Sequence, residues 1–248
     1  MSIEALVLRF DAPLMSFGGP LVDARGVTDR FPGRSLLTGL FANALGWDHR
    51  EGERMAQLQS RIVLASRIDR EGSPFVDFHT VDLGQPFMAR GWTTRGAAEG
   101  REGGTASEGT HIRHRHYIAD AVYTLAVALT GTSEPTLAEI GRALEQPARP
   151  LFLGRKACLP SRPLLIAQRT GDSLRAILEA EPRATPRDPR EATGPLAARF
   201  PEHDASDDVS RRVAVADDRD WLNQVHTGRR FVREGTVTPP GAQTRGIR

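Results

Sequence analysis

A stretch near the N-terminus combines two arginines, a serine and the start of an apolar helix, a combination that favours phosphate binding. Arg30 to Trp47 reads RFPGRSLLTGLFANALGW. Its apolar residues recur at helical spacing, and Gly46 stands where a helix would end. Ser35 is the natural N-cap, and the free N–H groups of a helix N-terminus favour an anion, here flanked by Arg30 and Arg34. An ordinary capped helix with solvated arginines explains these residues equally well.

The same residues imitate part of a nucleotide-binding P-loop. Gly33, Arg34 and Ser35 stand where such a loop has Gly-Lys-Ser. The motif also requires a glycine five residues earlier, where this chain has Thr28, and arginine replaces the lysine. The sequence therefore argues against nucleotide hydrolysis and leaves a held nucleic-acid backbone, or no ligand, at this helix.

The segment His111–Tyr117 could bind either a metal or RNA. On a strand, a period of two places His114 and His116 on one face. The other face carries His111, Arg113, Arg115 and Tyr117. Three imidazoles do not converge from one extended segment and the arginines repel a cation, so we expect no metal and no cofactor. Arginines beside a tyrosine are typical of single-stranded RNA binding, with a solvated strand face as the alternative.

Two shorter clusters could also carry chemistry. Asp77 and His79 share one face of a predicted strand, and a histidine oriented by a carboxylate can act as a general base. No nucleophile stands near them in the sequence, and such a pair is more often structural. Gly154, Arg155 and Lys156 lie between two predicted strands, where a glycine could let the backbone approach a phosphate.

The composition is that of a folded protein that stays in the cytoplasm. The chain has 248 residues, 39% of them hydrophobic, with no apolar run of 18 and no signal sequence. Its 33 basic and 31 acidic residues give a net charge of only +2, so bulk charge does not announce a nucleic-acid partner. Every basic residue except Lys156 is arginine, which suits phosphate binding but is equally explained by a GC-rich genome. The single cysteine, Cys158, is expected to be a buried apolar residue.

The hydrophobic pattern predicts an α+β domain. The expected order is strand, helix, strand, strand, helix, strand, the split βαβ arrangement of ferredoxin-like domains. The predicted strands are 3–10, 61–69, 74–81, 111–129, 151–154 and 162–168. One predicted helix begins at Ser35, and a second covers 135–147. A short turn-prone segment at 70–73 predicts that the second and third of these strands form a hairpin.

Three segments fall outside this pattern. Residues 84–110 are glycine-rich and too long for a turn, which is typical of a functional or disordered excursion. Five prolines and many charges between 181 and 208 predict a loop or linker. The region after it is short of core residues, and the last ten or so residues are predicted to be disordered.

Five separated segments together resemble a known family. They read RFPGRSLLTGLFANALG, DFHTV, HRHYIADAVYTLAVAL, LFLGRKACLPSRPL and GRRFVRE. In this order and spacing they resemble the CasD family, the Cascade subunit of type I-E CRISPR systems. The resemblance covers most of residues 3–233. It is weakest in the glycine-rich excursion, near 181–208 and in the tail.

The resemblance implies a noncatalytic subunit that holds the 5′ handle of the CRISPR RNA. It implies a ferredoxin-like (RRM-like) RNA-binding domain at 1–180, a linker and irregular C-terminal segment at 181–248, and a disordered tail from about 238. A long β-hairpin thumb at 84–112 would contact a partner through Phe87, Met88 and Trp92. The implied partners are the crRNA, the backbone filament subunit and the large subunit, with target DNA met indirectly and no membrane.

The expected RNA-binding residues extend from the first helix to the basic strand and the Gly154 loop. They are Arg25, Arg30, Arg34, Ser35, Thr38, His79, Arg113, Arg115, Tyr117, Arg155 and Lys156. The alternative is a metal-independent endoribonuclease, because type I-C relatives process precursor crRNA with the same fold. The available acid and base groups would then be Tyr117, His116, His79 and Lys156.

Overall fold

The computed structural model of this chain describes residues 2–19, 25–48, 50–82, 90–92, 98–100, 110–185, 194–204 and 210–240. Within these ranges the protein is α+β, with four α-helices and strands that pair mostly antiparallel. No helix in the described part of the chain is long and apolar enough to cross a membrane.

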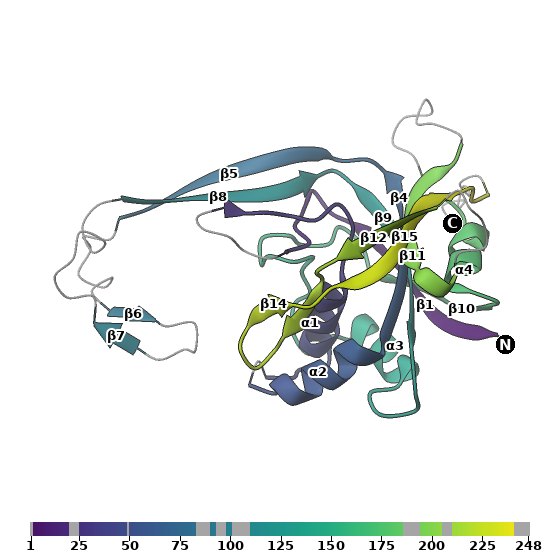
Figure 1. The fold of residues 1–248 in the computed structure, drawn as a ribbon, viewed down its shortest axis with the longest axis horizontal. Coiled ribbons are helices and arrows are strands. Elements are labelled where there is room, and N and C mark those ends of the chain that lie inside the picture. Colours follow the sequence, from purple (N-terminus) through teal and green to yellow (C-terminus); the bar gives the residue numbers. More distant parts are fainter. Residues whose placement is uncertain are drawn as a thin grey trace.

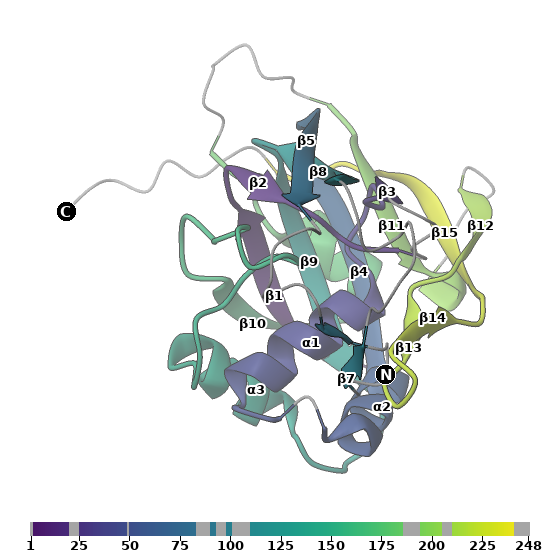
Figure 2. The same cartoon turned by 90° about the vertical axis from the view of Figure 1, so that its left-hand side faces the viewer.

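A seven-stranded antiparallel sheet forms the body (Figure 2). Its strand order is β10 (Leu165–Gly171), β1 (Ile3–Asp11), β9 (Val122–Leu129), β4 (Ile62–Arg70), β11 (Leu196–Pro201), β15 (Arg230–Val237) and β12 (Arg211–Val215). β1 was predicted to be a central strand because it is apolar on both sides. This prediction is confirmed, since Leu6 and Leu8 enter one core cluster and Ala5 and Val7 the other.

Helices cover both faces of the sheet. α1 (Arg34–Ala44), α2 (Gly52–Arg61) and α3 (Leu137–Glu145) lie on one face, where Leu37, Leu58 and Ile140 join the larger cluster. α4 (Leu174–Ala180) packs on the other face through Leu174 and Leu178. The predicted helix at 135–147 is confirmed, and Thr136 and Glu139 begin it with a capping box.

The elements around the 151–168 region differ from the prediction. Residues 150–164 form no strand, and β10 begins only at Leu165. The apolar residues of this loop are nevertheless used, because Leu153, Cys158 and Leu164 are buried in the larger cluster. Cys158 is the buried apolar residue that the sequence predicted.

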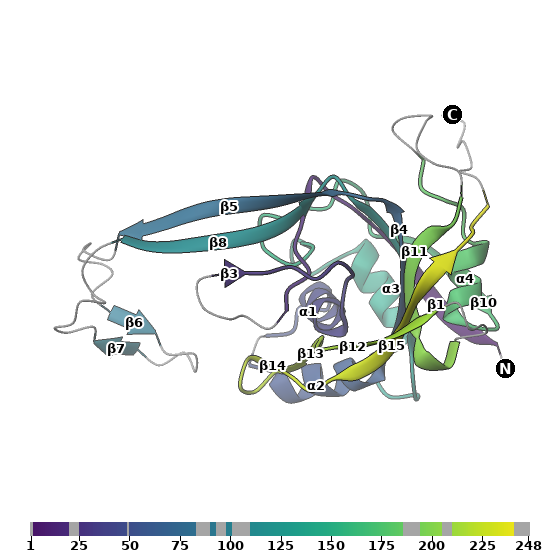
Figure 3. The same cartoon turned by 45° about the horizontal axis from the view of Figure 1, so that its top comes forward.

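A long two-stranded arm leaves the body (Figures 1 and 3). β5 (Ser73–Asp82) and β8 (Thr110–Ala119) pair antiparallel over ten residues, and the short pair β6 (Arg90–Trp92) and β7 (Ala98–Gly100) lies beyond them. β2 (Leu14–Met15) and β3 (Arg25–Gly26) pair with β8. The arm therefore begins before the predicted 84–112 thumb. Phe87 and Met88 lie outside the described residues, as does the Trp92 side chain.

The hairpin predicted between 61–69 and 74–81 is wrong. β4 pairs with β9 and β5 pairs with β8, so the chain passes from the body sheet into the arm without reversing. The predicted strand 111–129 is correspondingly broken at Asp120, which has a φ of +59°. The segment at 70–73 carries turn-prone residues because the strand changes direction there, and a sequence pattern does not distinguish this bend from a reversal.

The sequence predicted an irregular region after residue 181, but the described part of this region forms strands. β11, β15 and β12 extend the body sheet, with buried Phe200, Val215 and Val232. η2 (Glu202–Asp204) follows β11, and β13 (Asp218–Asp220) and β14 (Val225–Thr227) form a small hairpin. The buried apolar residues of these strands are separated by charged residues such as Arg199, Arg233 and Glu234, which is why this region looked poor in core residues. The predicted disorder of the tail concerns mainly 241–248, which lie outside the described residues.

A buried arginine joins α4 to the body sheet. Arg67 is fully buried, and its Nε donates to Asp69 Oδ1 at 2.8 Å. Its guanidinium also donates to the carbonyls of Leu178, Glu181 and Pro182. Arg67 thus fixes the end of α4 and the start of the C-terminal segment onto β4.

We expect Arg67→Ala to lower the free energy of unfolding by about 3–5 kcal/mol, because it removes the nearest cation from the buried Asp69 carboxylate and the donor from three carbonyls. Denaturant unfolding measures the loss. Arg162→Ala is the control, since that side chain is 79% exposed and its ion pair with Asp11 is long. Equal losses in the two variants would contradict a stabilising role for the buried network.

Candidate nucleic-acid interface

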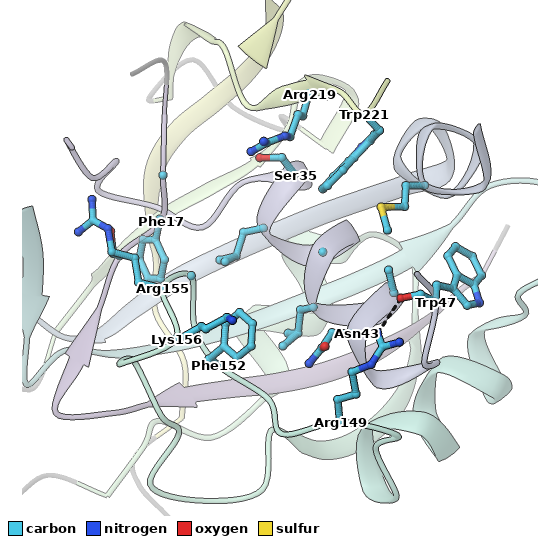
Figure 4. Close-up of a pocket in the computed structure, with 18 of the residues that line it drawn as sticks. Phe17, Ser35, Asn43, Trp47, Arg149, Phe152, Arg155, Lys156, Arg219 and Trp221 are labelled. Atoms are coloured by element: carbon cyan, nitrogen blue, oxygen red, sulfur yellow. Dashed lines mark hydrogen bonds between the residues drawn. The ribbon is translucent and has the colours of Figure 1, made fainter. Parts of the chain in front are cut away.

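An open groove of about 590 Å³ runs along the outer side of α1 (Figure 4). Ser35, Gly39 and Asn43 of α1 form its floor. The loop 149–156 forms one wall and the β13–β14 hairpin the opposite wall. Segments distant in the sequence therefore enclose one concave surface large enough for a small ligand or part of a chain.

The groove combines cations with aromatic rings. The cations are Arg149, Arg155, Lys156 and Arg219, and the rings are Phe17, Trp47, Phe152 and Trp221. No described acidic side chain other than Asp48 lines it. Phosphate contacts from cations and stacking surfaces from rings are what single-stranded nucleic acid requires.

Most of these cations also hold the groove together. Arg149 donates to the carbonyls of Gly46 and Trp47 at the end of α1, at 3.0 and 2.7 Å. Arg155 donates to the carbonyls of His116 and Gly26, at 2.7 and 2.9 Å. Lys156 is exposed, and no hydrogen bond or ion pair to it occurs within the described ranges.

Gly154 sets the path of the loop that carries Arg155 and Lys156. Its φ is +102°, and a Cβ at this position would lie 1.7 Å from the carbonyl oxygen of Ser16. Only glycine allows this conformation and this contact. The close backbone approach predicted for Gly154 therefore exists, but it is made to Ser16.

The N-terminus of α1 is occupied by a carboxylate of the protein itself. Gly33 is the N-cap, in place of the predicted Ser35, and no side chain of its own caps the helix. The Arg34 N–H donates to Asp217 Oδ2 at 3.1 Å, and the Ser35 N–H donates to the Asp217 carbonyl at 3.0 Å. Arg230 binds both oxygens of Asp217, at 2.8 and 2.6 Å. The sequence predicted that N–H groups at this helix start are free to bind a phosphate. This prediction is wrong, because the Arg34 and Ser35 N–H groups donate to Asp217 instead.

The two arginines near this helix start form ion pairs. Arg34 lies 3.4 Å from Asp218, and Arg30 lies 2.7 Å from Glu71. Both pairs are partly exposed, so contact of either arginine with RNA stays a prediction. The Ser35 side chain lines the groove.

Burial of Asp217 opposes its ionisation and would raise its pKa. The hydrogen bonds and charge of Arg230, together with the Arg34 N–H, outweigh burial and hold the pKa below its ordinary value. Asp217 is therefore a carboxylate at neutral pH, which keeps it bound to the positive end of α1.

Tyr117 is not the exposed stacking platform that the sequence predicted. Its side chain is buried in the larger core cluster, and the guanidinium of Arg155 lies 4.7 Å from the centre of its ring. The strand pattern alone could not show this, because the loop that covers the ring is about 40 residues away along the chain. A base has no access to this tyrosine.

The other residues of the arm divide between its two faces. The register places Asp77 opposite Arg115 and His79 opposite Arg113, on the face that carries Tyr117. The expected Asp77–His79 contact is present, with His79 Nε2 against Asp77 Oδ2. His116 lies on the opposite face with Val76.

Two further predicted RNA contacts lie in different settings. Thr38 is fully buried and its hydroxyl donates to the Arg34 carbonyl at 2.9 Å, so it is not available to a ligand. Arg25 is exposed on β3, beside His114 of β8.

Three of the four groups named for a nuclease, His79, His116 and Tyr117, do not converge. His79 is displaced from Tyr117 by four residues of strand register, about 13 Å. His116 faces the other way, and Tyr117 is covered by Arg155. Among the described residues no group of His, Cys, Asp and Glu could hold a metal.

Sequence reasoning missed most of the groove. Arg149, Trp47, Arg219, Trp221 and His226 line it, and none was predicted. The closest signal was the Arg219 and Trp221 pair in a region otherwise short of apolar residues. Such a pair indicates a ligand surface only once its neighbours are known.

Comparison with known proteins shows the family to which this chain belongs. A family model described as "CRISPR-associated protein (Cas_Cas5)" matches residues 5–233. This chain belongs to that family. The resemblance drawn from five sequence segments is thereby confirmed.

Relatives of known structure or description agree with the family. The CRISPR system Cascade subunit CasD of Escherichia coli (strain K12) is 28% identical over 186 residues, covering 71% of this chain and 77% of the relative. A chain of a CRISPR RNA-guided surveillance complex has a TM-score of 0.70 and 27% identity, covering 95% of this chain and 91% of that one. A further match, described as a crystal structure of a Cas protein, has a TM-score of 0.62 and 24% identity, covering 96% and 100% of the two chains. The last of these shows the fold alone.

We expect Asp217→Asn to destabilise the protein at pH 7 by about 1.5–3 kcal/mol, the range for hydrogen bonds to a charged group. Because the pKa of Asp217 is lowered in the folded state, its contribution is present above the ordinary Asp value of about 3.9 and is lost as the pH falls further. Denaturant unfolding of wild type and variant between pH 7 and pH 3 should therefore converge in acid. Asp218→Asn, at a half-exposed ion pair, is the control, and a pH-independent gap for Asp217→Asn would contradict the assignment.

Proposed function

We propose that this chain is a noncatalytic subunit of a type I-E Cascade complex that binds the 5′ handle of the CRISPR RNA. The groove along α1 is the observation that carries the proposal, because it gathers four cations and four aromatic rings on one concave surface. The family supports the same role, since the similar E. coli protein is a Cascade subunit and the similar solved chain belongs to an RNA-guided surveillance complex.

Within this proposal the RNA backbone follows the wall formed by the Gly154 loop. Lys156 is exposed and lacks a partner in the described part of the chain, so it can meet a phosphate without breaking another contact. Arg155 links this loop to β3 and β8, where Arg25, Arg113 and Arg115 continue the line of positive charge toward the arm. Phosphate contacts of this kind position the RNA and carry little sequence information.

The partners follow from the same role. We expect the chain to assemble with crRNA, the backbone filament subunit and the large subunit in the cytoplasm, and to meet target DNA only through pairing by the guide. The β5–β8 arm carries exposed Phe75, Val76, Phe78 and Ile112. Apolar side chains on a projecting hairpin suit a protein contact, which supports the thumb role expected for this part of the chain.

The fold proposal is a ferredoxin-like domain within residues 1–180. Strand order β10-β1-β9-β4, with α1 and α3 in the two crossovers, supports it. Residues 181–248 are then an addition whose strands lengthen the same sheet.

We expect Lys156→Ala to weaken RNA binding and to reduce its salt dependence. Loss of one phosphate contact should lower the slope of log K against log salt by about 0.7 for single-stranded RNA. Filter binding of the repeat RNA of its own CRISPR locus, across a salt series, measures the slope. Arg211→Ala is the control, because that side chain is 77% exposed on β12 and does not line the groove. An unchanged slope for Lys156→Ala would contradict RNA binding at the groove.

We also expect the purified chain to bind this RNA without cutting it. Incubation with precursor repeat RNA in EDTA, followed by a denaturing gel, should give no product. The separation of His79, His116 and Tyr117 is the physical reason, because general acid–base catalysis requires groups within hydrogen-bond reach of one scissile bond. A specific product that disappears in His116→Ala would favour the endoribonuclease instead.

A further inference from the structure

The β13–β14 hairpin forms one wall of the groove, and the proposed RNA contacts lie on the opposite wall. Arg219, Trp221 and His226, from β13, β14 and the turn that joins them, all line the groove. Figure 4 shows Arg219 and Trp221 along one side of α1, with Phe152 and Lys156 along the other side. The hairpin therefore faces the phosphate-binding loop across the groove.

One polar side chain, that of Gln59, fixes the position of the Trp221 indole. Trp221 Nε1 donates to Gln59 Oε1 at 3.0 Å, and the Arg219 N–H donates to the same oxygen at 3.1 Å. Gln59 Nε2 in turn donates to the Arg219 carbonyl at 3.0 Å. The side-chain amide of Gln59 on α2 thus forms hydrogen bonds with both the hairpin backbone and the indole. The ring is therefore held in one position before any ligand binds.

Two nitrogen atoms of the same hairpin have no hydrogen-bond partner. Arg219 Nε and His226 Nδ1 are removed from solvent, yet no described group accepts from or donates to them. Buried polar atoms are normally paired, and an unpaired one indicates a missing partner such as a water or a ligand. Burial, followed by the charge of Arg219, lowers the pKa of His226, so its imidazole is neutral at pH 7 and can donate or accept.

The charge of this wall favours RNA over a protein side chain as the occupant. The hairpin offers the half-buried ring of Trp221 and the Arg219 guanidinium, which lies 5.5 Å from the centre of that ring, and both face the cations of the opposite loop. By contrast Leu222, the next residue, is 68% exposed and does not line the groove. The hairpin therefore has two different surfaces: the polar groups of Arg219 and His226 face the groove, and the apolar side chain of Leu222 lies outside it.

We propose that the β13–β14 hairpin holds one unpaired nucleobase of the bound RNA, stacked on Trp221, with Arg219 and His226 at the polar edge of the base. This inference rests on the proposed function, and it gives the C-terminal segment a role in RNA binding. Stacking gives affinity for any base, and the two polar groups would favour a base with a hydrogen-bonding edge of matching geometry.

The test compares two substitutions that both preserve apolar packing. Trp221→Phe keeps an aromatic face, and Trp221→Leu removes it. With the full chain and the 5′ repeat fragment of its own CRISPR RNA, Trp221→Leu should lose about 5- to 150-fold in affinity, the range for one stacked base. Trp221→Phe should retain most of the affinity, and the control Leu222→Ala should stay within about twofold of wild type.

An abasic scan locates the base. Each nucleotide of the fragment is replaced in turn by an abasic residue. At one position the loss should match that of Trp221→Leu, and combining the two changes should cause no further loss, because both remove the same contact. Independent losses at every position would overturn the proposal.

Other outcomes also distinguish this inference from the proposed function. If wild type binds RNA and depends on Lys156 while Trp221→Leu binds equally well, the stacking site is wrong and the RNA groove stands. Loss of assembly with the large subunit in Trp221→Leu at unchanged RNA affinity would assign the ring to a protein contact and overturn the proposal. If wild type does not bind RNA at all, the proposed function itself fails.

Discussion

The ion pair between Asp217 and Arg230, placed on the N-terminus of α1, fixes the groove. Asp217 accepts from the Arg34 N–H, and its own carbonyl accepts from the Ser35 N–H. A Cβ at residue 33 would lie 2.6 Å from Asp217 Cβ, so Gly33 makes this approach possible. One carboxylate thereby takes the place of a helix cap and ties a segment 183 residues away to α1.

The rest of the groove depends on that attachment. β13 follows Asp217 directly, and its position brings Arg219 and Trp221 within reach of Gln59 on α2. On the opposite side, Arg155 and Arg149 use backbone carbonyls as partners, which fixes the loop without consuming acidic side chains. The surface therefore keeps its positive charge although most of its cations are already hydrogen-bonded. This balance suits a surface that holds an anionic chain in a fixed position.

The arm and the body are continuous strands with different surroundings. β4 and β9 are covered on both faces, whereas β5 and β8 continue them into solvent with exposed phenylalanines. Asp120, in the left-handed region, marks the change of direction on the return strand. The hairpin is thus an extension of the two strands β4 and β9, and the groove along α1 lies at its base.

The sequence by itself determined the local elements, because those depend on neighbours in the chain. The apolar run of β1, the capping box of α3 and the positive φ of Gly46 follow from short patterns, and five segments were enough to identify the family. Tertiary structure decided what each candidate side chain meets. Tyr117 has the strand position expected of a stacking platform, but Arg155 covers its ring. The N-terminus of α1 has the expected N–H donor, but this group donates to Asp217 and is not free for a ligand. Strand pairing and cap occupancy are set by contacts between residues far apart in the chain, and periodicity carries no information about such contacts.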